Sequence, residues 1–249
     1  MRFDGKVALI SGGGSGVGRA TAIAFAQRGA KVAVVDVNGE SAGKTMAEIE
    51  ATGGTAIAIV ADLAVAGEVD AMAARTMNVF GRLDILHNNA YGSRPTAQQS
   101  GVTLLAELDQ ARWDHAIKIG LTAVMQAIKA VVPIMQKQGG GTIVNTSSIA
   151  GLFADAGTAA YNTVKAGVIN LTRAVALEYA RDGMRGELCL PGRDRHAIVA
   201  KCADRRRLRG SDQGGDSDET DWPSRRDCQR RAVSGVRPGL VRDWRDHRG

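Results

Sequence analysis

Cysteine, histidine and aromatic residues are scarce in this chain of 249 residues, which has three cysteines, four histidines and 4% aromatic residues. All three cysteines fall within the last 65 residues, and their spacing fits neither a zinc site nor a disulfide framework. The histidines lie far apart along the chain, at His87, His115, His196 and His247. This scatter gives little support to a metal site or a histidine-based catalytic triad, and we expect no bound metal.

Long apolar runs are also missing, although 44% of the residues are hydrophobic. No stretch of 18 consecutive apolar residues occurs, so we expect no transmembrane helix and no membrane partner. The first 11 residues carry a short apolar stretch that leads into glycines rather than into a small-residue cleavage site. This pattern predicts a first strand and not a signal peptide. We therefore expect a cytoplasmic protein, long enough for one α/β domain with a full core.

The formal net charge of +6 is unevenly spread along the chain. Residues 1–184 hold 16 basic and 15 acidic side chains, whereas residues 185–249 hold 16 and 11, and 15 of those 16 cations are arginines. A basic tail is typical of nucleic-acid binders, but this one has no aromatic residues interleaved on a regular element. We expect no nucleic-acid partner. The change of composition instead divides the chain into a core, residues 1–185, and an aberrant basic segment, residues 186–249.

Up to residue 184, short β-branched runs alternate with helical segments. The predicted buried parallel strands are 6–11, 31–36, 55–60, 83–88 and 141–147. The predicted helices are 17–28, 40–51, 68–80, 113–138 and 159–181, and glycines at 29, 53–54 and 81 stand where helices should end. This alternation predicts an α/β fold with a doubly wound parallel sheet, Rossmann-like and in three layers.

The first predicted strand ends in a glycine-rich turn, SGGGSGVG at residues 11–18, that opens directly into a helix. Glycines permit a tight turn and let the backbone approach a pyrophosphate at the partly positive helix N-terminus. Asp36 ends the second strand, 18 residues beyond Gly18, where a carboxylate would accept hydrogen bonds from the adenosine ribose and repel a 2′-phosphate. The pattern predicts a dinucleotide site that favours NAD over NADP. The alternatives are an ordinary βα loop and an aspartate that only caps a turn.

Four motifs carry a family resemblance. They are S-G-x-x-x-G-x-G at residues 11–18, Ala61-Asp62-Leu63, Asn88-Asn89-Ala90, and Ser148, Tyr161 and Lys165 at S-x12-Y-x3-K spacing. Over residues 6 to about 184 the chain resembles the short-chain dehydrogenase/reductase family, although Tyr91 replaces the last glycine of the family's N-N-A-G motif. The resemblance implies a cofactor site formed by Ser11, Gly12, Ser15, Gly16, Val17, Gly18, Asp36, Val37, Asp62, Leu63, Asn89, Ala90, Tyr161, Lys165 and Pro191.

The same resemblance implies that Ser148, Tyr161 and Lys165 are catalytic. Tyr161 and Lys165 are four residues apart and so share one face of a helix. An ordinary tyrosine is a poor base at neutral pH, and a neighbouring ammonium stabilises its phenolate. Tyr161 would exchange a proton with the substrate oxygen, Ser148 would hold that oxygen, and Lys165 would bind the nicotinamide ribose. Taken singly, the three are also compatible with a packed aromatic, a solvated lysine and a turn serine.

Two features depart from the family pattern. The family has an asparagine in the long helix after the fourth strand, which holds a water on the proton path from the lysine, and Gly120 stands at that position here. We expect reduced turnover with intact cofactor binding, and a gain of rate in Gly120→Asn. The second departure begins near residue 186, where the family continues with a sixth strand, a substrate-covering helix pair and a seventh strand. In this segment the sequence predicts no packed element.

The basic segment has the composition that a GC-rich gene yields when it is translated out of frame. Permissible codons from Glu187 onward, translated one base later, give N-S-A-C-P-G-G-I-A-T-P-L-L, which resembles the family's sixth strand and the loop after it. The same shift from Trp222 gives a segment that resembles the family's last helix and seventh strand. We therefore predict a frameshift, in the gene or in its reading, near Arg185–Gly186. The alternative is a natural disordered basic tail, which would leave the sheet and substrate lid incomplete and the chain poorly stable and weakly active.

Together these features predict an NAD-dependent oxidoreductase that interconverts a secondary alcohol and its ketone by hydride transfer. Its partner is the small-molecule alcohol or ketone, and the resemblance implies a homo-oligomer, either a tetramer or a dimer. Tyr91, Leu152 and Phe153 favour an apolar substrate of cyclic or steroid-like shape. The alternative is a catalytically impaired or non-catalytic dinucleotide-binding protein, which Gly120 and the altered segment would suit.

Overall fold

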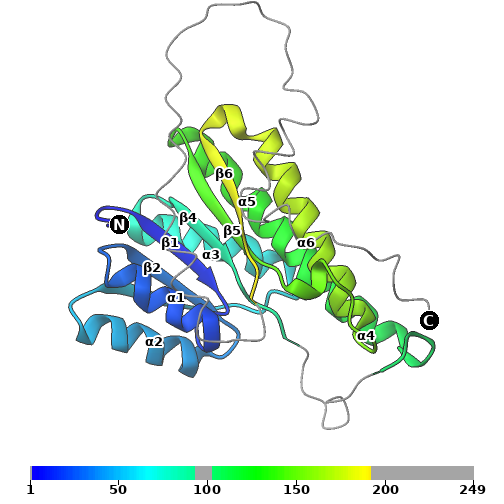
Figure 1. The fold of residues 1–249 in the computed structure, drawn as a ribbon. Helices are drawn as coiled ribbons and strands as arrows, with labels where there is room; N and C mark the ends of the chain where they lie inside the picture. The colour runs from blue at the N-terminus through cyan, green and yellow to red at the C-terminus, as the bar shows by residue number, and fades with distance from the viewer. Residues whose placement is uncertain (1, 93–102, 192–249) are drawn as a thin grey trace, which may run out of the picture. The chain divides into compact units, whose positions relative to one another are not determined.

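A single twisted parallel sheet organises the computed structural model, which describes residues 2–92 and 103–191 (Figure 1). The strands are β1 (Val7–Ser11), β2 (Lys31–Asp36), β3 (Thr55–Val60), β4 (Ile85–Asn88), β5 (Gly141–Thr146) and β6 (Met184–Cys189). They pair in the order β3-β2-β1-β4-β5-β6, and every pair is parallel. The chain starts in the middle and winds outward in both directions, so β1 and β4 form the switch point at which such sheets bind ligands. The predicted doubly wound α/β fold is confirmed.

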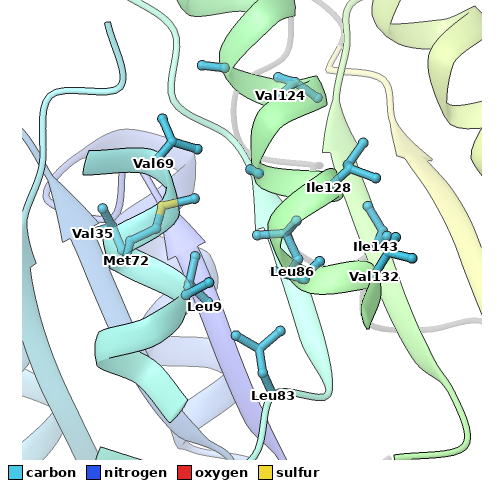
Figure 2. Close-up of a cluster of buried hydrophobic side chains, with 14 of the residues drawn as sticks. Leu9, Val35, Val69, Met72, Leu83, Leu86, Val124, Ile128, Val132 and Ile143 are labelled. Atoms are coloured by element: carbon cyan, nitrogen blue, oxygen red, sulfur yellow. The ribbon is translucent and has the colours of Figure 1, made fainter. Parts of the chain in front are cut away.

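Helices cover both faces of this sheet. α1 (Gly16–Ala26) and α2 (Gly39–Ala51) pack on one face, against Val32 and Val34 of β2. α3 (Ala66–Phe80), α5 (Ala123–Lys137) and α6 (Ala159–Glu178) share a second, larger cluster with Val35 and the central strands. Figure 2 shows side chains of α3 and α5 meeting over these strands. Neighbouring valines of β2 thus point to opposite faces, and this explains why the central strands are apolar throughout.

The helix of residues Gln110–Lys137 is apolar enough, by length and composition, to cross a membrane, with a mean hydropathy of 1.5 over its best window. It passes on average hydropathy, although it contains no long run of consecutive apolar residues. This is weak support for a membrane span, because the core helix of a globular domain passes the same test. Within this fold, 39% of the window is buried, and Val124, Ile128, Val131 and Met135 belong to the larger core cluster. We assign it as a core helix that leaves part of its apolar surface uncovered.

Two elements differ from those predicted. The single helix expected over residues 113–138 is divided into α4 (Gln110–Ile117), the π-helical turn η2 (Lys118–Thr122) and α5. In addition, β6 runs through Cys189, which corrects the prediction that no packed element follows residue 185. Backbone pairing with β5, from Gly141↔Met184 to Thr146↔Cys189, forms this strand even though its side chains are mostly polar. The basic segment from residue 192 onward, with the predicted missing or altered seventh strand, lies outside the described residues.

Shorter helical turns connect the main elements, at η1 (Leu105–Glu107), η3 (Ile149–Gly151) and η4 (Ala180–Asp182). The glycines predicted to end helices do so in the left-handed region. Gly29, Gly53 and Gly81 have φ of 93°, 79° and 73°. Glycine is the residue that adopts this conformation without a steric penalty, so these three positions mark where the chain turns back toward the next strand.

Candidate active site

The predicted site residues lie together at one edge of the sheet. Because all six strands are parallel, their carboxyl ends share this edge. The glycine loop follows β1, and the other predicted residues follow the remaining strands: Asp36 and Val37 at β2, Asp62 and Leu63 after β3, Asn89 and Ala90 after β4, Ser148 after β5, and Pro191 after β6. Since β1 and β4 are neighbours, the glycine loop and the segment 89–90 meet at the switch point.

The glycine loop is tightly packed, and two of its glycines leave no room for a side chain. A Cβ at Gly18 would run into the carbonyl oxygen of Gly12 and lie 2.6 Å from Nδ2 of Asn89. At Gly12, φ is +65° and a Cβ would lie 2.9 Å from Cα of Ala90. The loop is therefore folded against helix α1 and against the segment after β4. This is the close backbone approach for which a dinucleotide loop needs glycine.

Ser11 and Asn89 hold these two segments in place. The buried hydroxyl of Ser11 accepts hydrogen bonds from the backbone N–H of Asn89 at 3.1 Å and of Ala90 at 3.2 Å. The Asn89 side chain in turn donates from Nδ2 to the carbonyl oxygen of Gly12, at 3.3 Å. Two of the residues predicted to bind the cofactor therefore also support the loop from below.

The N-terminus of α1 presents backbone N–H groups that no side chain caps. Its N-cap residue, Ser15, forms no capping hydrogen bond, and the first turn holds no acidic residue. Two other helices differ, because Asn38 caps α2 and Asp109 caps α4 through side-chain oxygens. The first N–H groups of a helix have no partner within it and attract an anion. An uncapped helix that begins at the glycine loop therefore fits the pyrophosphate of a dinucleotide.

Asp36 is oriented by two backbone groups at the end of β2. Its Oδ2 accepts a hydrogen bond from the N–H of Gly14 at 2.9 Å, and its Oδ1 accepts one from the N–H of Asn38 at 3.0 Å. The turn-capping role considered as an alternative is therefore present. A carboxylate accepts about four hydrogen bonds, however, so two backbone donors leave room for ribose hydroxyls. The next residue, Val37, is 65% exposed and places an apolar surface, not a cation, beside this carboxylate.

Gly18→Ala is expected to abolish dinucleotide binding. The added methyl group would collide with the Gly12 carbonyl and force the loop apart, so we expect the Kd for NAD to rise at least a hundredfold. The cost of overpacking, about 1–3 kcal/mol, should also lower the free energy of unfolding. Titration calorimetry with NAD measures the first effect and urea unfolding the second. Gly67→Ala is the matched control, because a Cβ at Gly67 on α3 meets nothing within 4 Å.

Ser148, Tyr161 and Lys165 come from two elements that touch. Ser148 follows β5 and caps η3, where its Oγ accepts a hydrogen bond from the N–H of Ala150 at 3.1 Å. Tyr161 and Lys165 lie one turn apart near the start of α6. η3 is pressed against that part of α6, since a Cβ at Gly151 would lie only 2.7 Å from the backbone carbon of Lys165. The structure therefore brings the three predicted residues to one corner of the sheet edge.

Lys165 is a buried cation, with 4% of its surface exposed. Its Nζ donates a hydrogen bond to the carbonyl oxygen of Thr146 at 2.8 Å and lies 5.6 Å from the centre of the Tyr161 ring. Across residues 2–92 and 103–191, it forms no ion pair with a carboxylate. Burial lowers the pKa of Lys165 from 10.5 to about 8, against an opposing effect of Cys189. An ammonium held this close to a tyrosine ring is suited to stabilise a phenolate.

Two residues that the sequence did not single out, Thr146 and His87, lie beneath this corner. The hydroxyl of Thr146 donates to Oδ1 of Asn89 at 3.3 Å, and Nε2 of His87 lies 2.9 Å from the same hydroxyl. Since the hydroxyl proton is used toward Asn89, His87 must carry its own proton on Nε2. Burial lowers the pKa of His87 to about 4, in agreement with a neutral ring. The only sequence signals were the position of His87 in a buried strand and that of Thr146 two residues before Ser148.

Gly120 lies in the π-helical turn η2 and is buried. A Cβ there would collide with the side chain of Val164 and lie 2.9 Å from Cε2 of Tyr91. Gly120→Asn therefore cannot place a side chain without displacing its neighbours. The expectation that this substitution alone raises the rate is corrected, because the space is already occupied.

Comparison with known proteins follows the same lines as the fold. The family model described as short chain dehydrogenase matches residues 6–204. The chain belongs to this family. It is therefore an oxidoreductase of the short-chain dehydrogenase type, and residues 205–249 lie outside the matched region.

Several short-chain dehydrogenases are similar over most of the chain. Cyclohexanol dehydrogenase of Acinetobacter sp. (strain SE19) is 39% identical over 200 residues, which cover 80% of this chain and 77% of that one. A 3-oxoacyl-[acyl-carrier-protein] reductase of Synechocystis sp. is 40% identical over 188 residues, 75% of this chain and 73% of its own. Among solved structures, a 7α-hydroxysteroid dehydrogenase complexed with NADH and 7-oxo glycochenodeoxycholic acid superposes with a TM-score of 0.72 at 32% identity, covering 77% of this chain and 72% of that chain.

Proposed function

We propose that this short-chain dehydrogenase is an NAD-dependent enzyme that interconverts a secondary alcohol and its ketone, with Tyr161 as the general acid and base. The observation that carries the proposal is the buried ammonium of Lys165. It has no carboxylate partner among the described residues and lies 5.6 Å from the Tyr161 ring. Burying an unpaired charge costs stability, so a fold keeps such a group where it has a task.

The described residues would divide the work as follows. The glycine loop and the N-terminus of α1 would bind the pyrophosphate of NAD, and Asp36 would bind the adenosine ribose. NAD, when bound, supplies the nicotinamide that exchanges hydride with the substrate. Ser148 would donate a hydrogen bond to the substrate oxygen, Tyr161 would exchange the proton with that oxygen, and Lys165 would stabilise the phenolate and bind the nicotinamide ribose.

The proposal is tested by following NADH formation at 340 nm with a panel of secondary alcohols that includes cyclohexanol, together with NAD binding by calorimetry. We expect binding and turnover. NAD binding without turnover of any alcohol, or reduction of any ketone, would favour the rival function of a non-catalytic dinucleotide-binding protein. The position of Gly120 keeps that rival open, because the family's asparagine is missing there.

The substrate that we propose is an apolar, ring-shaped alcohol. Three large apolar side chains after Ser148 are exposed, with Ile149 and Leu152 each at 41% and Phe153 at 59%. Exposed apolar groups beside a catalytic serine are suited to bind an apolar ligand. The names of two relatives agree with this class, since one is a cyclohexanol dehydrogenase and one a hydroxysteroid dehydrogenase. A higher kcat/KM for cyclohexanol than for a linear polyol would support it.

Asp36→Ser is expected to shift the preference of the enzyme toward NADP. Loss of charge-assisted hydrogen bonds to the ribose, at about 1.5–3 kcal/mol, should lower kcat/KM with NAD by roughly tenfold to a hundredfold. Removal of the carboxylate should at the same time raise kcat/KM with NADP, because the repulsion of the 2′-phosphate disappears. Asp70→Ser, at an exposed position on α3, is the control. Unchanged selectivity in Asp36→Ser would show that Asp36 does not face the ribose.

We also propose a cytoplasmic homo-oligomer, a dimer or tetramer, formed through the long helices. The apolar surface of the helix Gln110–Lys137 is only partly buried within the chain, and Met125 on α5 and Leu177 on α6 are 41% and 48% exposed. Partly covered apolar helix faces are typical of subunit interfaces. Light scattering after size-exclusion chromatography should give a mass of two or four chains, and a mass of one chain would exclude the assembly.

Finally, we propose that the basic segment results from a frameshift near Arg185–Gly186. Three observations support it: the change to arginine-rich composition, the end of the family match at residue 204, and relatives of which this chain covers only about three quarters. The nucleotide sequence around codon 186 is expected to contain one extra base, or the intact protein to have a mass other than the 26.1 kDa of the printed chain. An uninterrupted reading frame and a measured mass of 26.1 kDa would together reject the frameshift.

A further inference from the structure

Tyr91 lies between three parts of the candidate active site. Its ring forms an edge-to-face contact with the ring of Tyr161, with centroids 5.1 Å apart and planes at 70°. The Nζ of Lys165 lies over the same ring, 4.9 Å from its centre and closer than to the ring of Tyr161. The third neighbour is Gly120, where an added Cβ would lie 2.9 Å from Cε2 and 3.0 Å from Cδ2 of Tyr91. One ring therefore contacts both residues of the proposed proton-transfer pair and closes the space at Gly120.

The contact at Gly120 depends on the unusual backbone there. Gly120 is the central residue of the π-helical turn η2 between α4 and α5, and it is buried against Val164 of α6. A π turn widens the helix by one residue and is frequent at functional sites. Here it brings a backbone without a side chain against the edge of the Tyr91 ring. The two positions thus fit each other, a large ring opposite a missing side chain.

The contact at Lys165 is favourable because the ammonium has few other partners. Burial has removed most of its water, and the Thr146 carbonyl is the one hydrogen-bond acceptor recorded for Nζ among the described residues. A cation over the face of an aromatic ring is stabilised, more strongly when both are shielded from water. The ring therefore restricts where the ammonium can lie relative to Tyr161.

We propose that Tyr91 is a positioning residue that holds Lys165 and Tyr161 in register through its ring, and that Gly120 is glycine because this ring occupies the space. The proposal rests on the proposed function for its kinetic consequence, but its geometry stands independently. Tyr91 acts through its two neighbours and takes no proton itself. Burial and the neighbouring Tyr161 raise the pKa of Tyr91, so its hydroxyl stays neutral at working pH.

The first test separates the ring from the bulk of the side chain and from its hydroxyl. Tyr91→Phe keeps the ring and should retain most of kcat. Tyr91→Leu keeps bulk without an aromatic face and should lower kcat about tenfold, as loss of one shielded cation–π contact would. The KM for NAD should change little in either variant. Equal activity of the Phe and Leu variants would overturn the proposal, as would a loss in Tyr91→Phe as large as that in Tyr91→Leu.

The second test does not require turnover. In a thermal-unfolding cycle, Gly120→Ala should lower Tm more in the parent chain than in a Tyr91→Ala background, because its methyl group then meets no ring. Acetylation of Lys165 by an amine reagent, followed by mass spectrometry, should speed up severalfold in Tyr91→Ala and stay near the parent rate in Tyr91→Phe. Additive effects in the cycle, together with unchanged labelling, would reject the placement of the ring. A parent chain that binds NAD without turnover would instead count against the proposed function, while these two measurements still decide the role of Tyr91.

Discussion

Tyr161→Phe is expected to lower kcat about a thousandfold while leaving NAD binding intact. The substitution removes one oxygen atom, the group that would exchange a proton with the substrate, and general acid–base catalysis is worth roughly 10²–10⁴-fold. The ring remains, so its packing against Tyr91 and under Lys165 should persist. Steady-state kinetics with NAD and an alcohol, paired with calorimetric measurement of the Kd for NAD, gives both quantities.

The chain supplies a matched control for this variant. It has three tyrosines, and Tyr179 lies at the other end of the same helix, as the C-cap of α6. Tyr179→Phe also removes one phenolic oxygen but is far from the catalytic corner, so kcat should be unaffected. A loss of activity in Tyr161→Phe of less than tenfold would remove Tyr161 from the role of general acid and base.

Lys165→Met is expected to abolish turnover and, at the same time, to stabilise the fold. Methionine has a similar length and no charge, so it fills the buried site without the cost of an unpaired ammonium. The folded-state pKa of about 8 lies below the ordinary 10.5, and thus the folded chain binds the proton less tightly than the unfolded chain. The penalty is fully present below pH 8 and is relieved as the pH rises from about 8 toward 10.5. At pH 7 the gain in the free energy of unfolding should be on the order of 1–3 kcal/mol.

Two measurements check this second prediction. Urea unfolding of parent and variant at pH 7 and at pH 10 should show a difference that shrinks at the higher pH. Lys129→Met, at an exposed position on α5, is the control and should show little change in either stability or kcat. A Lys165→Met variant that is less stable than the parent would mean that the lysine is structural. A variant that keeps full turnover would exclude Lys165 from the mechanism.

Much of the fold followed from local patterns. The five strands expected up to residue 147 are all present, because runs such as VALIS and KVAVVD must be buried on both faces of a sheet. The end of a helix at Gly81 was predictable since that residue adopts a positive φ. The sixth strand was not expected from MRGELC, because its pairing depends on the backbone of β5 and not on its own side chains. The π turn at Gly120 was likewise hidden, since the hydrophobic period continues through it from α4 to α5.

The candidate site divides in the same way. Ser148, Tyr161 and Lys165 are recognisable from their spacing, and their convergence on one corner follows from helix periodicity and parallel strands. Thr146 and His87 were not recognisable, because a threonine or histidine at the end of a buried strand has no pattern of its own. Tyr91 was seen in the sequence only as a departure from a motif. Its contacts with Lys165 and Gly120 join residues 74 and 29 positions away along the chain.

The sequence by itself determined the fold class, the order of the βα units and the chemistry carried by the glycine loop and by the Ser-Tyr-Lys set, because each depends on contacts between neighbours in the chain. Only the tertiary structure decided that Lys165 is buried without a carboxylate partner among the described residues, that α1 begins with uncapped N–H groups, and that the Tyr91 ring fills the space at Gly120. These properties arise from the packing of segments far apart in the chain, where burial, not spacing, sets the energy of a charge or a ring.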